Sequence, residues 1–153
     1  IHANYLRNTS IQSIVPTLLK KLSEAGYNVI FLPRYESDRD YARLIDNLHI
    51  PDSPLNGLDL CYYSDAVLTG AGTLAREAAC LGVPSFSFYA GKDLLAVDQQ
   101  LIKQKQIFYS RDIQSILNQL NKSSKHEANL NRSVTVREEV KHKLNELIGN
   151  WNE

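Results

Sequence analysis

Apolar residues recur near the start of the chain with the spacing of a helix. They occupy positions 11, 14, 15, 18, 19 and 22, which share one face at 3.6 residues per turn. We expect this helix to take Ser13 as its N-cap, because Pro16 is tolerated only in a first turn, and to end at Gly26. The segment from Asn28 to Leu32 is a short apolar run before Pro33, which is typical of a buried parallel strand.

Helical and strand patterns alternate over the following residues. The predicted helices are Ser37 to about Leu48, Leu58–Tyr63, Thr73–Leu81, Leu94–Lys103 and Asp112–Leu120. The predicted strands are a short one at His49–Ile50, then Ala66–Leu68, Ser85–Phe88 and Ile107–Tyr109. Strands joined by single helices imply right-handed crossovers. We therefore predict an α/β fold: a three-layer α/β/α, Rossmann-like domain with a mostly parallel sheet.

The chain divides into three parts by composition. Residues 1–120 carry the alternating pattern, 121–132 form a polar run that reads as a linker, and 133–153 carry a terminal amphipathic helix. The apolar side of that helix comprises Val136, Val140, Leu144, Leu147 and Ile148. A sheet of this kind normally opens with its central strand, so residues 1–5 are either the end of that strand or the strand lies upstream.

Overall composition excludes several classes of partner. The 153 residues contain 17 Lys and Arg against 17 Asp and Glu, so the formal net charge is zero, and nothing suggests binding to nucleic acid or to an anionic membrane. No apolar run approaches the ~20 residues of a membrane span, and we expect a soluble, cytoplasmic protein. The chain lacks methionine, which suggests an excerpt of a longer protein. Its two cysteines and four histidines show no metal-ligand spacing, so we assign no metal.

Candidate chemistry is concentrated between Leu68 and Glu77. A strand, a glycine turn and a helix follow in that order, and such a helix start offers free N–H groups to an anion. Gly70 and Gly72 allow close approach of a phosphate, Thr73 can cap the helix or donate its hydroxyl, and Glu77 could accept two sugar hydroxyls. Arg76 could neutralise a phosphate or pair with an acid. The alternative is a plain tight turn with a capping threonine and a solvated glutamate.

The same turn also fits the dinucleotide fingerprint G-x-G-x-x-G/A, which would indicate an NAD-dependent oxidoreductase. That fingerprint belongs on the first strand of its unit, with an acidic residue at the end of the next strand. Here it follows a late strand, and the next strand ends in Phe88-Tyr89-Ala90. These two features count against the oxidoreductase.

The run Ser64–Pro84 contains an aspartate-led strand, a Gly-Ala-Gly-Thr turn, an Arg-Glu-Ala-Ala helix and a Leu-Gly-Val-Pro stop. It resembles the C-terminal domain of an uncharacterised archaeal and bacterial family related to B-type glycosyltransferases and UDP-N-acetylglucosamine 2-epimerase. The resemblance extends to Leu32-Pro33-Arg34, Gly91-Lys92 and Val97-Asp98, and so covers most of residues 11–110.

This resemblance implies one half of a two-domain, B-type glycosyltransferase arrangement. The cleft would bind a nucleotide-diphosphate sugar, most simply a UDP-sugar, with the missing N-terminal domain as partner and no cofactor. The implied nucleotide and phosphate contacts are Gly70, Ala71, Gly72, Thr73, Glu77, Arg34 and Lys92, with Asp98 as a possible sugar contact. Ala71 replaces the first glycine of the family's pair, and its methyl group narrows the approach to the backbone.

Several of these residues have equally simple structural explanations. Arg34 could form a surface ion pair with Glu36 or Asp38, Lys92 could be a solvated loop residue, and Asp98 a helix-surface acid. The tyrosines that could stack on a uracil ring, or simply be half-buried, are Tyr62, Tyr63 and Tyr89.

Two functional hypotheses stay open. The first is a glycosyltransferase- or epimerase-like enzyme in which this domain anchors the nucleotide. The second is a degenerate binding or assembly module of the same fold without catalysis, favoured by Ala71 and by the absence of an evident catalytic histidine. The catalytic residues are unknown, and the terminal helix is expected to pack on this domain or on the missing one. In isolation the chain should bind nucleotide weakly and turn over nothing.

Overall fold

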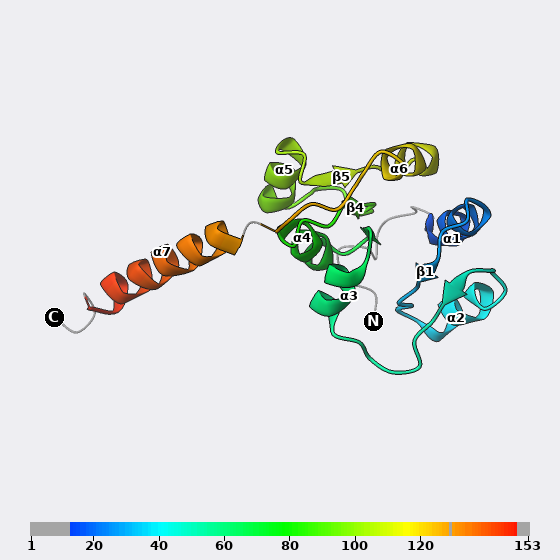
Figure 1. Ribbon diagram of the computed structural model, residues 1–153, viewed down its shortest axis with the longest axis horizontal. Helices are drawn as coiled ribbons and strands as arrows, with labels where there is room; N and C mark the ends of the chain where they lie inside the picture. The colour runs from blue at the N-terminus through cyan, green and yellow to red at the C-terminus, as the bar shows by residue number, and fades with distance from the viewer. Residues whose placement is uncertain (1–12, 129, 150–153) are drawn as a thin grey trace.

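The computed structural model describes residues 13–128 and 130–149 (Figure 1). Its helices are α1 (Val15–Glu24), α2 (Glu36–Ala42), α3 (Gly57–Tyr63), α4 (Gly72–Cys80), α5 (Ala96–Lys103), α6 (Ile113–Leu120) and α7 (Leu130–Gly149). Its strands are β1 (Val29–Ile30), β2 (Leu48–His49), β3 (Val67–Thr69), β4 (Ser85–Ser87) and β5 (Ile107–Tyr109). The predicted alternation is therefore confirmed, and the fold is α/β. The expectation for residues 1–5 lies outside the described residues.

The strands form two separate parallel sheets. Strands β3, β4 and β5 lie side by side in chain order, and β1 pairs with β2 alone. Within the described residues the strands thus form two parallel sheets rather than one, and the central strand expected near residues 1–5 lies outside those residues. The predicted buried strand Asn28–Leu32 shrinks to two residues, and Ile30 and Leu32 are 48% and 47% exposed. Its apolar run is thus only partly covered.

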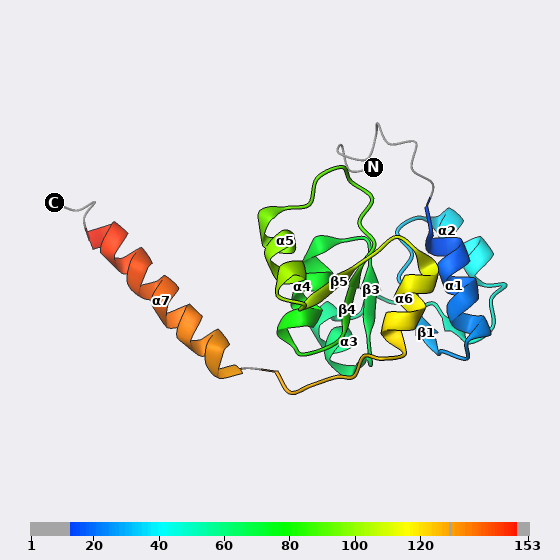
Figure 2. The same cartoon turned by 90° about the horizontal axis from the view of Figure 1, so that it is seen from above.

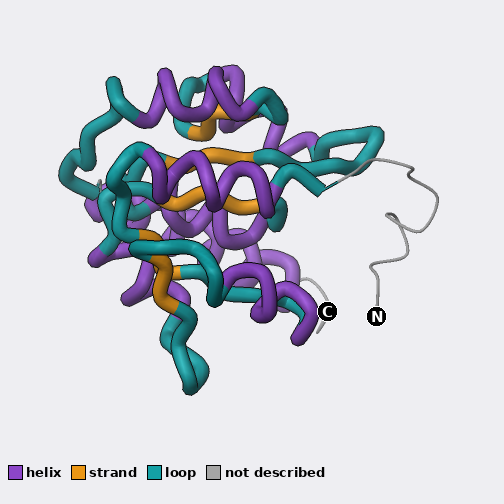
Figure 3. The backbone as a smooth tube through the Cα atoms, turned by 90° about the vertical axis from the view of Figure 1, so that its right-hand side faces the viewer, coloured by secondary structure: helices purple, strands orange, loops and turns teal. Residues whose placement is uncertain are grey.

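Helices cover both faces of the three-stranded sheet (Figures 2 and 3). On one face, Leu18 and Leu22 of α1 and Ile116 of α6 pack with Phe86 of β4. The other face carries α3, α4 and α5, and its core cluster comprises Cys61, Val67, Ala78 and Val83. These layers give the Rossmann-like α/β/α layout that the sequence predicts.

Small residues let α4 approach the sheet closely. Ala75 and Ala78 of α4 are buried, as are Ser85 and Ser87 of β4. The Ser85 hydroxyl donates to the Ala75 carbonyl at 2.7 Å, which satisfies a polar group inside this interface. The Ser-Phe-Ser pattern therefore belongs to a strand that is buried on both faces. Close packing here fixes the position of the turn that precedes α4.

The first two helices differ in their bounds from the prediction. Ile14, not Ser13, is the N-cap of α1, although the Ser13 hydroxyl accepts the Val15 N–H at 3.3 Å. Helix α2 ends at Ala42, well before Leu48, because the chain turns and Asn47 takes a left-handed conformation with φ 57°. Asparagine tolerates that conformation better than most residues. The turn lets Leu48–His49 form the strand β2.

Helix α7 extends away from the rest of the chain (Figures 1 and 2). It begins at Leu130, inside the predicted linker, and its apolar residues are exposed, from 47% at Val136 to 63% at Leu147. The expected packing of this helix on the domain is not seen within residues 130–149; a role against a missing domain stays a prediction. The segment before α7 contacts the rest of the domain, because the His126 N–H donates to the Gly82 carbonyl at 3.0 Å. Among the described residues, no helix has the length and apolarity that crossing a bilayer requires.

Candidate functional site

The glycine turn lies at the carboxyl end of β3, immediately before α4. Ala71 is the N-cap of α4, so of the two roles considered for Thr73 the structure does not show capping of this helix. An alanine side chain has no acceptor for the first N–H groups of the helix. The Thr69 hydroxyl accepts the Ala71 N–H at 2.9 Å and tightens the turn just before it. The start of α4 is therefore not capped by the side chain of its own N-cap residue.

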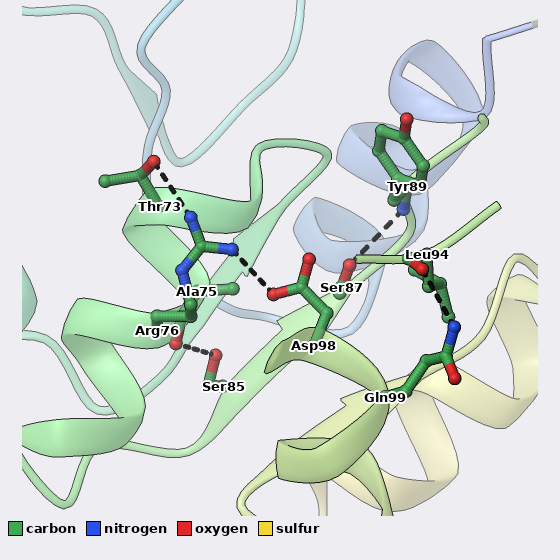
Figure 4. A network of polar contacts seen from close by, with 9 residues as sticks. All are labelled: Thr73, Ala75, Arg76, Ser85, Ser87, Tyr89, Leu94, Asp98 and Gln99. Atoms are coloured by element: carbon green, nitrogen blue, oxygen red, sulfur yellow. Dashed lines mark hydrogen bonds and ion pairs between the residues drawn. The ribbon is translucent and has the colours of Figure 1, made fainter. Parts of the chain in front are cut away.

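An ion pair joins α4 to α5 beside this turn. Arg76 Nη1 donates to Asp98 Oδ1 at 2.7 Å, and Arg76 Nη2 donates to the Thr73 hydroxyl at 3.3 Å (Figure 4). The two charged side chains are 26% and 13% exposed. Asp98 is thus neither a solvated surface acid nor distant from the turn. Of the two roles weighed for Arg76, this structure shows pairing with an acid.

Both glycines of the turn face side chains at short range. A Cβ atom on Gly72 would lie 2.8 Å from Arg76 Nη1 and 3.2 Å from Asp98 Oδ2. On Gly70 it would lie 3.2 Å from a ring carbon of Phe88. A side chain at position 72 would therefore displace the end of the Arg76 side chain, whether or not a ligand also approaches.

Glu77 lies one helical turn beyond Thr73 and is partly buried. No hydrogen bond or ion pair to another described residue engages its carboxylate. Burial, followed by the nearby Glu77 charge, raises the pKa of the Cys61 thiol on α3. The Glu77 carboxylate therefore keeps its acceptor capacity with respect to the described residues.

The remaining predicted contacts, Arg34 and Lys92, lie in other loops than the glycine turn. Arg34 is exposed between β1 and α2, outside the three-stranded sheet, with its guanidinium 5.9 Å from the centre of the Tyr35 ring. Glu36 pairs with Arg39 at 3.3 Å, and Asp38 accepts the Tyr35 N–H, so the ion pair considered for Arg34 is wrong. Lys92 is exposed in the loop between β4 and α5.

The three tyrosines divide between the two edges of the sheet. Tyr62 and Tyr63 end α3, just before β3 begins, which puts them at the edge opposite to the glycine turn. There Lys125 Nζ lies 4.5 Å from the centre of the Tyr62 ring and donates to the Tyr62 carbonyl. Stacking of these two rings on a base bound at the turn is excluded in this arrangement. Tyr89 follows β4 at the same edge as the turn, and its phenol covers Gly91.

A hollow of about 440 Å³ opens at the edge of the sheet opposite to the turn. Its lining includes Ala79 at the end of α4, Gln104–Gln106 before β5, and residues 122–124 and 126 after α6. The hollow thus lies at the ends of α4, α5 and α6, and its lining includes Lys105 and Lys122. The glycine turn is instead part of the open surface of this chain.

Sequence reasoning missed the pairing of Arg76 with Asp98. The two residues are 22 positions apart and belong to different helices. Both lie within motifs that the sequence singled out, Arg-Glu-Ala-Ala and Val97-Asp98, and that coincidence was the available signal. Among the described residues, no group of three or more His, Cys, Asp or Glu side chains could hold a metal ion.

Comparisons with known proteins place the chain in a family. Its relative MJ0665, an uncharacterized protein of Methanocaldococcus jannaschii, is 33% identical over 108 residues, which are 70% of this chain and 31% of the relative. The chain thus spans about a third of the length of that protein. No solved structure matches. The family model described as "Protein of unknown function (DUF354)" matches residues 1–150, and the chain therefore belongs to the DUF354 family.

Proposed function

We propose that this chain is the nucleotide-diphosphate-sugar-binding half of a glycosyltransferase- or epimerase-like enzyme. The diphosphate binds at Gly70–Thr73, Glu77 accepts the ribose hydroxyls, and a second domain completes the cleft. UDP-sugars are the first ligands to test. The oxidoreductase alternative gains no support, because the turn follows β3 rather than β1.

The observation that carries this proposal is the start of α4. A parallel strand leads into a helix whose N-cap residue offers no side-chain acceptor, at the carboxyl edge where ligands bind to such sheets. One turn further on, Glu77 holds a carboxylate that no described residue engages in a hydrogen bond or ion pair. N–H groups that can donate to an anion are thus followed by a carboxylate that can accept hydrogen bonds from hydroxyl groups. This order matches the order of diphosphate and ribose in a nucleotide.

The direct test is calorimetric titration of UDP and UDP-sugars into the protein at its natural length. Glu77→Gln should weaken UDP binding by about 10- to 100-fold, because two charge-assisted hydrogen bonds to the ribose are lost. Asp40→Asn, which removes an exposed carboxylate on α2, is the matched control and should change nothing. Absence of heat with every nucleotide, or equal affinity in Glu77→Gln, would refute the proposal.

Ala71 offers a second test at the turn itself. Ala71→Gly removes the methyl group and should tighten UDP binding several-fold. Ala71→Asp supplies both a cap and a fixed negative charge, so it should stabilise α4 by about 1 kcal/mol and weaken UDP binding. An Ala71→Asp variant that binds UDP normally would place the diphosphate elsewhere.

A degenerate module without catalysis is the second candidate. It is favoured by the Asp98 carboxylate, which already engages the cation beside the turn. In that case the Asp98 carboxylate stays paired with Arg76, and no ligand anion is bound there. Nucleotides would then give no thermal stabilisation, whereas a ligand at 100 times its dissociation constant adds about 2.7 kcal/mol to a binding protein.

A further inference from the structure

The Arg76–Asp98 pair has the properties of an exchangeable contact. Arg76 lies in the second turn of α4, close to the positive end of the helix dipole, where a cation is disfavoured unless an anion accompanies it. Asp98 supplies that anion from α5, and its second oxygen reaches the Gly72 α-carbon side of the turn. The carboxylate therefore stands beside the place proposed for the diphosphate.

We infer that Asp98 is an internal counter-anion, which the diphosphate of the ligand displaces from Arg76 on binding. The inference rests on the proposed function and adds a recognition rule to it. A ligand must carry enough negative charge to replace a carboxylate, so the site selects diphosphates over monophosphates and uncharged nucleosides. Arg76 then becomes a ligand-contacting residue that sequence reasoning left undecided.

Little apolar packing surrounds Asp98 at the start of α5, so its release from Arg76 should have a small free-energy cost. Helix α5 buries none of its residues, and its N-cap Leu95 makes no side-chain capping bond. Leu95 and Val97 at its start are 62% and 48% exposed. The Arg76–Asp98 ion pair is a polar contact between the start of α5 and α4. Releasing Asp98 would expose little apolar surface at the start of α5, while the half-buried Leu101 and Ile102 stay packed at its other end.

Arg76 gains from the exchange because of its geometry. A guanidinium presents five N–H donors in a planar fork, and the structure uses one on Asp98 and one on Thr73. A diphosphate offers several oxygens in the plane of that fork, so two bonds can replace the single bond to the carboxylate. While Asp98 stays in place, its charge repels the incoming phosphate over a few ångströms.

The test compares Asp98→Asn and Arg76→Gln at natural length. Asparagine keeps an oxygen for Arg76 but removes the negative charge, so the affinity for UDP should rise about tenfold. The affinity for UMP should rise by a larger factor than the affinity for UDP. Arg76→Gln should weaken UDP binding about tenfold, and uridine should bind all proteins alike. Asp93→Asn and Lys103→Gln, exposed residues near α5, are the charge-matched controls and should match the wild type. Thermal unfolding checks that each variant is folded, with Arg76→Lys as the substitute for Arg76→Gln.

Hydrogen exchange gives a readout that a purely structural ion pair would not produce. UDP should speed exchange in α5 of the wild type and slow it at residues 70–73, with no effect on α5 in Asp98→Asn. Weaker or unchanged UDP binding in Asp98→Asn overturns the inference while leaving the proposed function intact. If neither the wild type nor any variant binds UDP, the proposed function is refuted. Inorganic pyrophosphate then tests the inference separately. Tighter pyrophosphate binding by Asp98→Asn than by the wild type supports the inference, and equal or absent binding refutes it.

Discussion

The strands of the two parallel sheets come from similar apolar runs in the sequence but differ in how deeply they are buried. Phe86 in β4 is 1% exposed, between α1 and α6 on one side and α4 on the other. Ile30 in β1 is 48% exposed, and among the described residues its sheet consists of two strands of two residues each. Parallel strands are stable when both faces are covered, and helices supply that cover only for β3–β5. The carboxyl edge of β3 and β4 therefore belongs to the sheet whose two faces are covered by helices.

The largest expected effect separates the two cores directly. Phe86→Ala should lower the free energy of unfolding by about 4 kcal/mol, because it empties a fully buried site. Ile30→Ala should cost about 1 kcal/mol, because half of the side chain already contacts water. Denaturant unfolding of the full chain measures both. Similar losses for the two variants would show that β1 is as well packed as β4.

Two glycines with positive φ provide the next contrast. Gly82, with φ +72°, precedes β4, and an added Cβ would collide with the His126 carbonyl. Gly26, with φ +82°, precedes β1 and has nothing within 4 Å. Gly82→Ala should therefore cost about 3 kcal/mol, and Gly26→Ala about 1 kcal/mol for backbone strain alone. Equal costs in denaturant unfolding would mean that residues 121–128 do not hold Gly82 in place.

Helix caps on the two sides should differ more modestly. Asn56 caps α3, beside the three-stranded sheet, by accepting the N–H groups of Leu58 and Asp59 at 3.0 and 3.3 Å. Asn56→Ala should lower the free energy of unfolding by about 1 kcal/mol. Asp38 of α2 makes one longer contact to the Tyr35 N–H at 3.3 Å, so Asp38→Ala should cost less. A larger loss in Asp38→Ala would reverse the ranking of the two regions.

The smallest effect is a dependence on alkaline pH. Burial raises the pKa of the Cys61 thiol above 9.0, and the negative charge of Glu77 is the second cause. Burial also raises the pKa of the Tyr41 phenol above 10.0, and the negative charge of Asp38 is the second cause. A raised folded-state pKa adds stability that is complete below the unfolded value and is lost as pH rises through the folded value. Cys61→Ala should remove the part of this loss that begins above pH 9, and Tyr41→Phe the part above pH 10. Unfolding curves from pH 8 upward that keep the same slope in both variants would contradict this assignment.

Much of the fold could be predicted from the sequence, because its signals are local. The turn at Gly82, the Asp112 cap of α6 and the order of helices and strands each depend on a few adjacent residues. The glycine turn was located for the same reason. Helix α2 was predicted too long because nothing in its periodicity reveals that Asn47 adopts φ 57° immediately before the strand β2.

The sequence by itself determined the α/β alternation, the turn before α4 and, through the family model that matches residues 1–150, membership of the DUF354 family. Only the tertiary structure decided that the strands divide into two sheets and that Asp98 meets Arg76 across 22 residues. The physical reason is range. Periodicity and turn chemistry act between neighbours in the chain, whereas burial and ion pairing depend on which elements come to lie together. The partners of Arg76 are decided at that second level, and on our proposal so is the ligand.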